Sequence, residues 1–372
     1  MKRKIYIYQQ DNWPHFFWNS KEISDLLALV RNKQGRLIGK MDALGFDLKN
    51  EAHLETLTSD ILKSNEIEGV ILNKKDVRSS IARRLGIDIG GLPPVNRNIE
   101  GIVDMMFDAT TNFNLPLSKQ RLFDWHLALF LNGKSGMYDI KVGDWRDDST
   151  GPMQVVSGAM GKEKVHFQAP KSDTINTEMS YFLDWLNKTT EMDLVLKASI
   201  AHLWFVTIHP FEDGNGRITR AITDMILAKS DGLSQRFYSM SAQIQKNRKS
   251  YYDILEKTQK SNLDITEWIV WFLKTLLQAI INSDKTLSKV IFKHHFWNTY
   301  GKEIKNDRQK KMLNKLLDNF KGNLTTSKWA KITKCSQDTA LRDIQDLINK
   351  NILIKAKSGG RSTNYELNKH QF

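Results

Sequence analysis

The segment His209-Pro-Phe-Glu-Asp-Gly-Asn-Gly-Arg-Ile-Thr-Arg220 decides how this sequence is interpreted. Its glycines tolerate positive φ, so the chain can direct consecutive backbone N–H groups toward one point. The loop opens a predicted helix over 216–229, whose free N–H groups and positive end make an anion site suited to phosphates. The pattern therefore predicts a phosphate-binding loop formed by Gly214, Asn215 and Gly216.

The charged side chains of the same segment predict what happens to a bound phosphate. Arg217 and Arg220 lie three residues apart, so they share a face of the helix, and guanidinium groups bind phosphate oxygens bidentately. Asp213 lies beside the loop, where a carboxylate can hold Mg²⁺ against phosphates. Histidine ordinarily titrates near neutral pH, so His209 can accept a hydroxyl proton. Together these groups predict phosphoryl or nucleotidyl transfer. The segment is not a P-loop, because the Gly-Lys-[Ser/Thr] pattern is absent.

The segment resembles the signature of the Fic (filamentation induced by cAMP) family, His-x-Phe-x-[Asp/Glu]-Gly-Asn-Gly-Arg-x-x-Arg, at every fixed position. The resemblance implies a mainly α fold with a helical Fic core. It implies a protein adenylyltransferase that moves AMP from ATP to Ser, Thr or Tyr hydroxyls of target proteins. In this comparison His209 is the catalytic base, Phe211 anchors the loop and Asp213 is the Mg²⁺ ligand. The phosphate contacts fall to Gly214, Asn215, Gly216, Arg217 and Arg220.

A second motif, Ser64-Asn-Glu-Ile-Glu-Gly69, has two interpretations. By itself it is typical of a solvated acidic helix end. It also resembles the inhibitory helix, [Ser/Thr]-x-x-x-Glu-[Gly/Asn], of bacterial Fic proteins that carry this helix N-terminal to the core. That resemblance implies that Glu68 pairs with Arg220 and leaves ATP in an unproductive pose. Ser64 and Glu68 would then inhibit the chain in cis.

The segment Met153–Gln168 has β-branched residues on both sides of a Gly-rich centre, a pattern that predicts a β-hairpin. It lies where the Fic family has a flap over the active site. A strand edge there could hold a target segment by β-augmentation, while the alternative is an ordinary surface hairpin. The predicted docking residues are Val155, Val156, Ser157 and Gly158.

The segment from Tyr251 to Gln259 resembles the adenine-side helix of the family. Tyr251, Tyr252 and Gln259 could stack on the base or hydrogen-bond to it. Relatives often have Asn at the last of these positions, and core packing is the alternative for the tyrosines. By contrast, His126 and His202 lie in apolar helical patterns that favour hydrogen-bonded core histidines.

Helix-period patterns dominate the chain, and three domains are expected: an N-terminal helical domain over 1–92, the Fic core over 93–284, and a linker helix with a winged helix over 285–372. Gly90-Gly-Leu-Pro-Pro94 breaks the chain between the first two. The predicted helices are 21–32, 50–72, 96–109, 118–130, 174–188, 192–208, 216–229, 244–259, 264–283, 308–320, 326–332 and 337–350. Apart from 153–168, the middle of the chain carries no recognisable strand pattern.

The C-terminal region changes character, with helix, helix-turn-helix and then strands at 352–355 and 363–367 around Ser358-Gly-Gly-Arg361. This is the order of a winged helix. Residues 306–372 hold 14 Lys+Arg against 6 Asp+Glu, so +8 of the formal net charge of +13 lies there. DNA is therefore a candidate partner through 306–372, with base contacts from Gln337, Thr339, Arg342 and Arg361 and phosphate contacts from Lys328, Lys331 and Lys334. Asp338, Asp343 and Asp346 argue against it, and dimerisation or protein docking is the alternative.

Composition narrows the remaining choices. A single cysteine, Cys335, excludes an intrachain disulfide, and the longest apolar stretches are too short to span a bilayer. We therefore expect a soluble, cytoplasmic protein. The Fic resemblance implies ATP and target proteins as partners, Mg²⁺ as cofactor, and a homodimer as a further candidate. The alternative functions are a DNA-binding transcriptional regulator with a Fic-like sensor core, or a Fic enzyme that removes AMP or transfers another phosphate-linked group.

Overall fold

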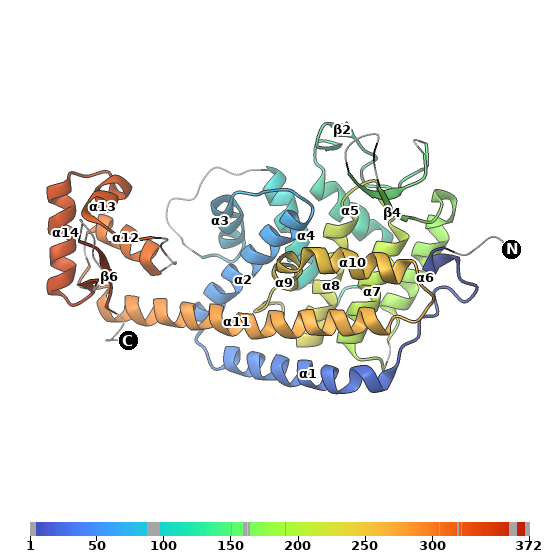
Figure 1. The fold of residues 1–372 in the computed structure, drawn as a ribbon, viewed down its shortest axis with the longest axis horizontal. Helices are drawn as coiled ribbons and strands as arrows, with labels where there is room; N and C mark the ends of the chain where they lie inside the picture. The colour runs from blue at the N-terminus through green and yellow to red at the C-terminus, as the bar shows by residue number, and fades with distance from the viewer. Residues whose placement is uncertain are drawn as a thin grey trace. The chain divides into compact units, whose positions relative to one another are not determined.

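The computed structural model describes residues 5–87, 97–149, 151–158, 162, 164–189, 191–304, 306–317, 320, 322–356 and 363–368, apart from the side chains at 46, 47, 285, 286 and 289. The chain is mainly helical, as predicted (Figure 1). It divides into two compact units, Met1–Asp284 and Lys285–Phe372. The division falls within helix α11 (Thr266–Tyr300). Each unit has a hydrophobic core of its own and is described separately.

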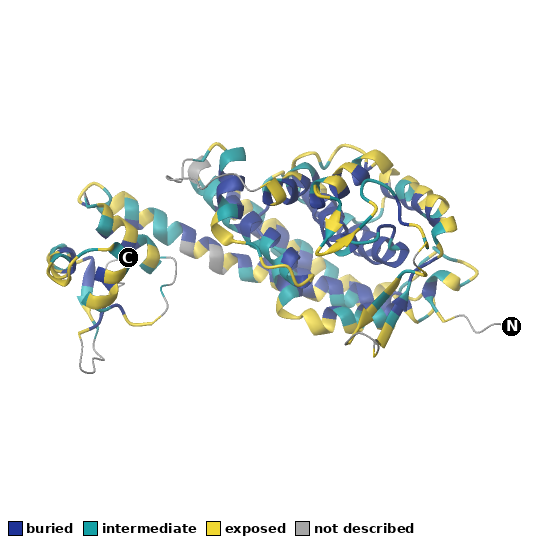
Figure 2. Ribbon diagram, turned by 90° about the horizontal axis from the view of Figure 1, so that it is seen from above, coloured by how far each residue is buried: buried dark blue, intermediate teal, exposed yellow. Residues whose placement is uncertain are grey.

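Two central helices organise the first unit. The apolar sequence of α7 (Leu194–Ile208) covers its whole circumference, and α7 is buried from Val195 to its end, as expected of a helix apolar on every side. It packs against α8 (Asn215–Asp231). Asp193 begins α7 by accepting the backbone N–H of Val195. Buried residues concentrate on the central helices of this unit (Figure 2).

Other helices surround this pair. The segment α2 (Phe46–Ile67) contacts α3 (Lys74–Arg84), α4 (Arg97–Thr111), α8 and α9 (Met240–Lys246). The remaining helices of the unit are η1 (Ile7–Gln9), α1 (Ser20–Asp42), α5 (Lys119–Leu129), η2 (Ser172–Thr174), α6 (Ile175–Asn187) and α10 (Arg248–Gln259). In the N-terminal segment Trp13 and Phe16 make edge-to-face contacts with Trp204 of α7. These aromatic residues therefore join the N-terminal segment to the central helices.

The structure corrects several predicted elements. The helix predicted over 50–72 ends at Ile67, and α3 follows it where no helix was predicted. The helix predicted over 244–259 is two helices, α9 and α10, because the backbone leaves helical geometry at Asn247 (φ −114°, ψ 31°). The absence of further strands was also wrong, since β1 (Lys134–Ser135) pairs with β2 (Tyr138–Asp139).

The hairpin predicted over 153–168 is confirmed. Strand β3 (Gln154–Ser157) pairs antiparallel with β4 (Lys164–Gln168), with Val155 opposite Phe167 and Ser157 opposite Lys164. The register shifts between Val155 and Val156, which is the mark of a β-bulge. Among the described strands β3 has β4 as its single neighbour, so its other edge is open.

The second unit combines helices α12 (Asp307–Leu317), α13 (Thr326–Thr333) and α14 (Gln337–Asn349) with an antiparallel ribbon of β5 (Leu353–Lys355) and β6 (Tyr365–Leu367). Its core centres on Trp329, Met312 and Ile344. This order of elements agrees with the predicted winged helix, which stays a prediction. Arg361 at the predicted wing tip and the break at Gly90–Pro94 lie outside the described residues.

A search of the described residues for a helix long and apolar enough to cross a lipid bilayer finds none.

Candidate functional site

The predicted phosphate loop joins the two central helices. His209 ends α7 in the left-handed region (φ 53°, ψ 57°), and Gly214 precedes α8 with φ 83°. Between them the Asn215 amide bonds twice to the backbone of Phe211: Oδ1 accepts its N–H at 3.0 Å and Nδ2 donates to its C=O at 2.7 Å. The Asn215 side chain therefore bonds to the backbone within the loop and holds the loop closed.

The imidazole of His209 is oriented by its own helix. Its Nδ1 lies 3.2 Å from the carbonyl oxygen of Val206. Because a carbonyl can only accept, Nδ1 carries the proton and Nε2 keeps its lone pair. Burial and, to a smaller extent, the charge of Arg146 lower the pKa of His209 to about 4. The ring is therefore neutral at physiological pH, in the tautomer of a proton acceptor.

A cluster of aromatic side chains packs against the predicted phosphate loop. Phe211 is fully buried and stacks on His126 with ring centroids 4.2 Å apart, as predicted for a loop anchor. The Nδ1 of His126 accepts the N–H of Gly143 at 3.1 Å, so its Nε2 donates to the carbonyl oxygen of Asp213 at 3.0 Å. The prediction of a hydrogen-bonded core histidine is confirmed, and His126 also fixes the backbone of Asp213.

Arg146 holds the backbone of the predicted phosphate loop at His209. Its side chain is completely buried and pairs with Asp148 at 2.7 Å. It also donates from Nε to the carbonyl oxygen of His209 at 2.8 Å and from Nη2 to that of Pro170. One guanidinium therefore connects the predicted phosphate loop to the chain that leaves β4.

Asp213 offers the carboxylate predicted to hold Mg²⁺. Its side chain is 41% exposed, and its Oδ2 accepts the Ser135 hydroxyl at 2.5 Å. Among the described residues no group of three or more His, Cys, Asp or Glu side chains could enclose a metal ion. A single accessible carboxylate fits Mg²⁺, because this ion is commonly held by one or two carboxylates together with substrate phosphates and water.

The first turn of α8, which follows Asp213 in the sequence, provides backbone N–H donors. The N–H of Ile218 is the first to bond to a preceding backbone carbonyl, that of Gly214, so the N–H groups of Asn215, Gly216 and Arg217 have no intrahelical acceptor. Arg217 is buried, with its guanidinium 4.7 Å above the Phe130 ring. A positive helix end and a fixed cation therefore meet at one point, as an anion site requires.

A carboxylate from α2 occupies this point. Glu68 Oε1 forms an ion pair with Arg220 Nη1 at 2.8 Å. Arg220 is buried and also donates to the hydroxyl and the carbonyl oxygen of Ser64, each at 2.8 Å. A Cβ placed on Gly216 would lie 2.1 Å from Glu68 Oε1. The carboxylate thus rests directly on the first turn of α8, and the ion pair expected between Glu68 and Arg220 is present.

The end of α2 explains how Glu68 reaches this position. Gly69 has φ +84° and donates to the carbonyl oxygen of Glu66, while Val70 donates to that of Asn65. These two bonds make a Schellman motif, in which glycine accommodates the left-handed residue. The helix therefore ends at Ile67, and the side chain of the next residue, Glu68, extends toward α8.

The predicted adenine-side residues are less accessible. Tyr251 is 2% exposed, with its hydroxyl 2.9 Å from Nε2 of His202, and Gln259 is 5% exposed and donates to Thr207 at 3.2 Å. These contacts favour core packing for both. Tyr252 is half-buried, and its hydroxyl donates to the carbonyl oxygen of Ile67 at 3.3 Å, beside Glu68. Tyr251 likewise interacts with Arg220 and Glu68, so both tyrosines lie next to the anion site.

The flap residues are accessible, and one of them has a defined partner. Val156 is 48% exposed, and Gln154 and Ser157 are exposed as well. The hydroxyl of Ser157 lies 2.6 Å from Nε2 of His166 on the neighbouring strand. His166 in turn contacts Glu256 of α10 through Nδ1 at 2.6 Å. The hairpin is therefore bonded to α10 through the contact between His166 and Glu256.

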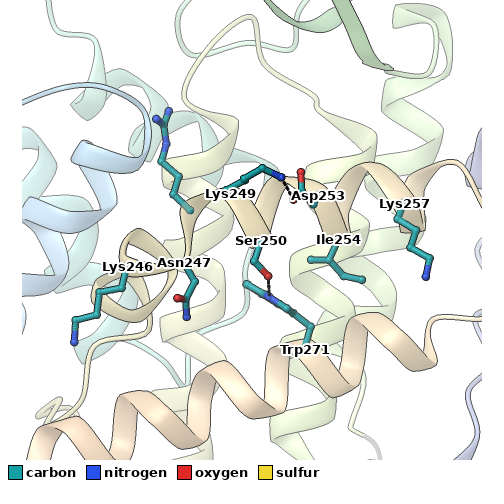
Figure 3. Close-up of a pocket in the computed structure, with 9 residues that line it drawn as sticks. Lys246, Asn247, Lys249, Ser250, Asp253, Ile254, Lys257 and Trp271 are labelled. Atoms are coloured by element: carbon teal, nitrogen blue, oxygen red, sulfur yellow. Dashed lines mark hydrogen bonds and ion pairs between the residues drawn. The ribbon is translucent and has the colours of Figure 1, made fainter.

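A separate groove of about 550 Å³ lies between the start of α10 and α11 (Figure 3). Lys246 and Lys257 lie at opposite ends of it, and Trp271 donates to Ser250 within it at 3.0 Å. Lys249 and Lys257 are already paired with Asp253 and Glu267. None of the residues that line this groove belongs to the segment 209–220, so it is distinct from the predicted site.

Sequence analysis missed three contributors to the site. Ser135 was not singled out, because a serine in a two-residue strand carries no recognisable pattern. His166 and Glu256 are far apart in the sequence and meet only in the fold. Their signal in the sequence is weak: a histidine in the predicted flap and an acid on the predicted adenine-side helix.

Comparison with known proteins agrees with this geometry. Residues 116–227 match the Fic/DOC family, and this part of the chain is a Fic/DOC family domain. Residues 6–87 match a domain of unknown function, DUF4172.

Two curated relatives are named as protein adenylyltransferases. The chain is 31% identical to protein adenylyltransferase Fic of Culex quinquefasciatus over 237 residues, which are 62% of this chain and 43% of that protein. It is 29% identical to a probable protein adenylyltransferase of Aquifex aeolicus over 101 residues, 27% of this chain and 29% of that protein. The matches therefore span less than half the length of these relatives.

Among solved structures, a Fic family protein from Desulfovibrio desulfuricans G20 superimposes with a TM-score of 0.54 at 20% identity, covering 94% of this chain and 97% of that one. At this identity the likeness concerns the fold alone.

Proposed function

We propose that the chain is a self-inhibited protein adenylyltransferase that moves AMP from ATP to Ser, Thr or Tyr hydroxyls of target proteins. The observation that carries the proposal is the neutral imidazole of His209, whose Nε2 keeps a lone pair, in the loop that leads into the N-terminus of α8. A base next to a phosphate site is what transfer of a phosphorus group to a hydroxyl requires. The names of the relatives support AMP as the transferred group.

In the proposed reaction the first turn of α8 and Arg217 hold the phosphates of ATP. The target hydroxyl gives its proton to Nε2 of His209 while its oxygen bonds to the α-phosphorus. The bond from that phosphorus to the bridging oxygen breaks, and pyrophosphate leaves. Mg²⁺, held by Asp213 together with the phosphates, would neutralise negative charge on the departing group.

Glu68 is proposed to be the inhibitor. Its carboxylate is paired with Arg220 and rests on Gly216, where it would repel the outer phosphates and withhold a guanidinium from them. Both effects disfavour the productive pose of ATP. A coupling of about 1–3 kcal/mol between two such states changes an equilibrium roughly 5- to 150-fold.

The test compares Glu68→Gly with Glu66→Gly. The two side chains are almost equally exposed, 29% and 28%, but Glu66 pairs with Lys63 and not with Arg220. Each variant is incubated with labelled ATP, Mg²⁺ and a cell lysate, and modified proteins are identified by mass spectrometry. We expect Glu68→Gly to raise labelling roughly 5- to 150-fold and Glu66→Gly to match the wild type. Equal labelling in both variants would remove Glu68 from the mechanism.

His209→Ala tests the base separately. We expect ATP binding to persist by calorimetry and transfer to disappear, because the ring acts on the target hydroxyl. A variant that still transfers AMP contradicts the proposed role. The mass added to the target separates AMP from UMP, phosphocholine or phosphate, and incubation with an AMP-modified protein detects removal of AMP.

A second candidate function, DNA binding by the second unit, is favoured by the placement of two acids. Asp343 is buried and pairs with Arg308 at 2.8 Å, and Asp346 accepts from Gln309 at 2.8 Å and Lys350 at 2.7 Å. They are therefore engaged within the unit. Exposed residues on α13, on α14 and in the turn between them include Lys328, Lys331, Lys334, Gln337 and Arg342.

Duplex DNA binding is measured by gel shift across a salt series, because phosphate contacts weaken steeply as salt rises. The triple variant Lys328→Glu, Lys331→Glu, Lys334→Glu should lose binding. The charge-matched control, Lys246→Glu, Lys249→Glu, Lys257→Glu in the groove of Figure 3, should keep it. Equal loss in both triple variants indicates nonspecific attraction and contradicts a DNA site on the second unit.

A further inference from the structure

A serine, a histidine and a glutamate form a connected row outside the predicted catalytic loop. The hydroxyl of Ser157 on β3 lies 2.6 Å from Nε2 of His166 on β4, and Nδ1 of His166 lies 2.6 Å from Oε2 of Glu256 on α10. The carboxylate can only accept, so Nδ1 carries the proton, and in the neutral ring Nε2 holds a lone pair. The Ser157 hydroxyl therefore donates to His166.

The carboxylate at the end of the row is held in its ionised form. Glu256 Oε1 accepts from Lys260 at 2.7 Å. The hydrogen bond from Lys260, followed by that from His166, lowers the pKa of Glu256 to about 2. An ionised carboxylate stabilises the imidazolium that forms when His166 accepts a proton, which is the arrangement that activates a hydroxyl nucleophile.

Two series of contacts connect the row with the residues around the anion site. Glu256 is one turn of α10 after Tyr252, whose hydroxyl contacts the carbonyl oxygen of Ile67 next to Glu68. On the other side, β4 leads to Pro170, which Arg146 ties to the carbonyl oxygen of His209. The flap that carries Ser157 is therefore joined to the base and to the inhibitory helix. Ser157 itself is exposed, so a phosphorus centre can approach it.

We propose that Ser157 is a reactive nucleophile, activated by His166 and Glu256, that accepts a phosphorus group from a bound nucleotide. The Ser157 oxygen bonds to the phosphorus, the leaving group departs with the electron pair of the broken P–O bond, and the proton passes to Nε2 of His166. This step rests on the proposed function in one respect: with ATP the phosphorus is the α-phosphorus and the leaving group is pyrophosphate. Ser157 would then carry AMP on the chain itself.

The first test needs no nucleotide. The full chain is treated with a fluorophosphonate, whose fluoride is the leaving group, and labelled peptides are quantified by mass spectrometry. Ser24 is the internal control, because it is exposed and bonds only weakly, at 3.4 Å, to the carbonyl oxygen of Lys21. We expect Ser157 to react at least about a hundredfold faster than Ser24, the lower end of the range for a positioned base. His166→Gln and Glu256→Gln should abolish this advantage. Equal rates at the two serines in the wild type overturn the proposal.

The second test uses the Glu68→Gly chain with ATP and Mg²⁺, and maps AMP by peptide mass. AMP on Ser157, lost in His166→Gln, supports the proposal. AMP on other hydroxyls with Ser157 unmodified contradicts it, although the proposed transferase activity would then stand. A chain that reacts with fluorophosphonate at Ser157 but moves no AMP to any protein contradicts the proposed function instead, because the reactivity of Ser157 is established by the first test.

Discussion

At the scale of single residues, His209 combines an uncommon backbone with a neutral ring. Few residues other than glycine adopt positive φ, and φ 53° at His209 turns the chain out of α7 into the phosphate loop. Holding such a residue costs on the order of 1–3 kcal/mol, which the surrounding structure must offset. Here Arg146, bonded to the carbonyl oxygen of His209, and the Asn215 bridge to Phe211 hold the loop in place.

This neutral ring predicts the pH dependence of transfer. Burial and the charge of Arg146 lower the pKa of His209 to about 4, and the neutral form is the proposed base. Transfer by Glu68→Gly should therefore stay level as pH falls from 7 to about 5 and decline only near pH 4, whereas an unperturbed histidine would lose activity near pH 6.5. The measurement is the initial rate of AMP transfer from pH 4 to pH 8 on a target shown to stay folded. An acid limb near pH 6.5 would contradict a buried, neutral His209.

Ser135 gives the second residue-scale prediction. Its hydroxyl donates to Asp213 Oδ2 at 2.5 Å and so orients the carboxylate proposed to hold Mg²⁺. Removing a group that orients a metal ligand commonly weakens binding 10- to 100-fold. Ser135→Ala should therefore weaken Mn²⁺ binding to the ATP complex by about tenfold, measured by electron paramagnetic resonance. Ser24→Ala on α1 is the control, and unchanged Mn²⁺ affinity in Ser135→Ala would show that Ser135 does not position the metal ligand.

At the scale of secondary-structure elements, glycines within helices have opposite roles in this fold. In α4, a Cβ on Gly101 would lie 2.0 Å from the carbonyl oxygen of Ala128, so this glycine allows α4 to contact α5. In α1, a Cβ on Gly35 would meet no atom within 4 Å. Gly101→Ala should therefore destabilise the chain by about 1–3 kcal/mol through overpacking.

The matched substitution Gly35→Ala should instead stabilise the chain by about 0.5–1 kcal/mol, because alanine favours the helix. Urea unfolding of both variants measures the difference. Two substitutions of the same sign would contradict the close approach of α4 and α5.

The elements that sequence analysis missed have physical reasons in common. Helix α3 is rich in Lys, Arg and Ser and buries a short stripe that includes Val77 and Ile81, so its apolar periodicity is weak. The strands β1 and β2 are two residues long, too short to show alternation. The break at Asn247 involves neither proline nor glycine. In each case tertiary packing, and not local propensity, decides the element.

At the scale of the whole molecule, the site residues that are close together in the sequence could be predicted. The contacts between residues far apart in the sequence could not. The segment 209–220 holds its base, anion loop and arginines within one loop and helix, so their proximity follows from the sequence. The pairing of Glu68 with Arg220 came from a family resemblance. Contacts such as Ser135 with Asp213 and His166 with Glu256 join single polar residues from separate elements. No periodicity in one sequence encodes such pairs, so only the fold reveals them.

The core of the first unit contains several neutral histidines, and these couple its stability to pH. Burial is the main reason that the pKa of His53 and of His126 is lowered to about 4, and that of His202 to about 3. In the unfolded chain a histidine titrates near 6.5. Below that pH the histidines of the unfolded state bind protons, whereas these buried histidines of the folded state stay neutral. The stability from each neutral histidine is therefore complete above pH 6.5 and is lost as pH falls toward 4.

His202 allows this to be isolated. It is fully buried between Thr223 and the hydroxyl of Tyr251, each 2.9 Å away. His202→Gln keeps a polar side chain but removes the titrating ring, so between pH 7 and pH 5 the variant should lose about 1–2 kcal/mol less stability than the wild type. Tyr251→Phe removes a partner without adding a group that titrates in this range, so it should lower stability equally at both pH values. Urea unfolding at pH 7 and pH 5 measures each variant. If the losses of His202→Gln and the wild type between the two pH values are equal, His202 is not held neutral by burial.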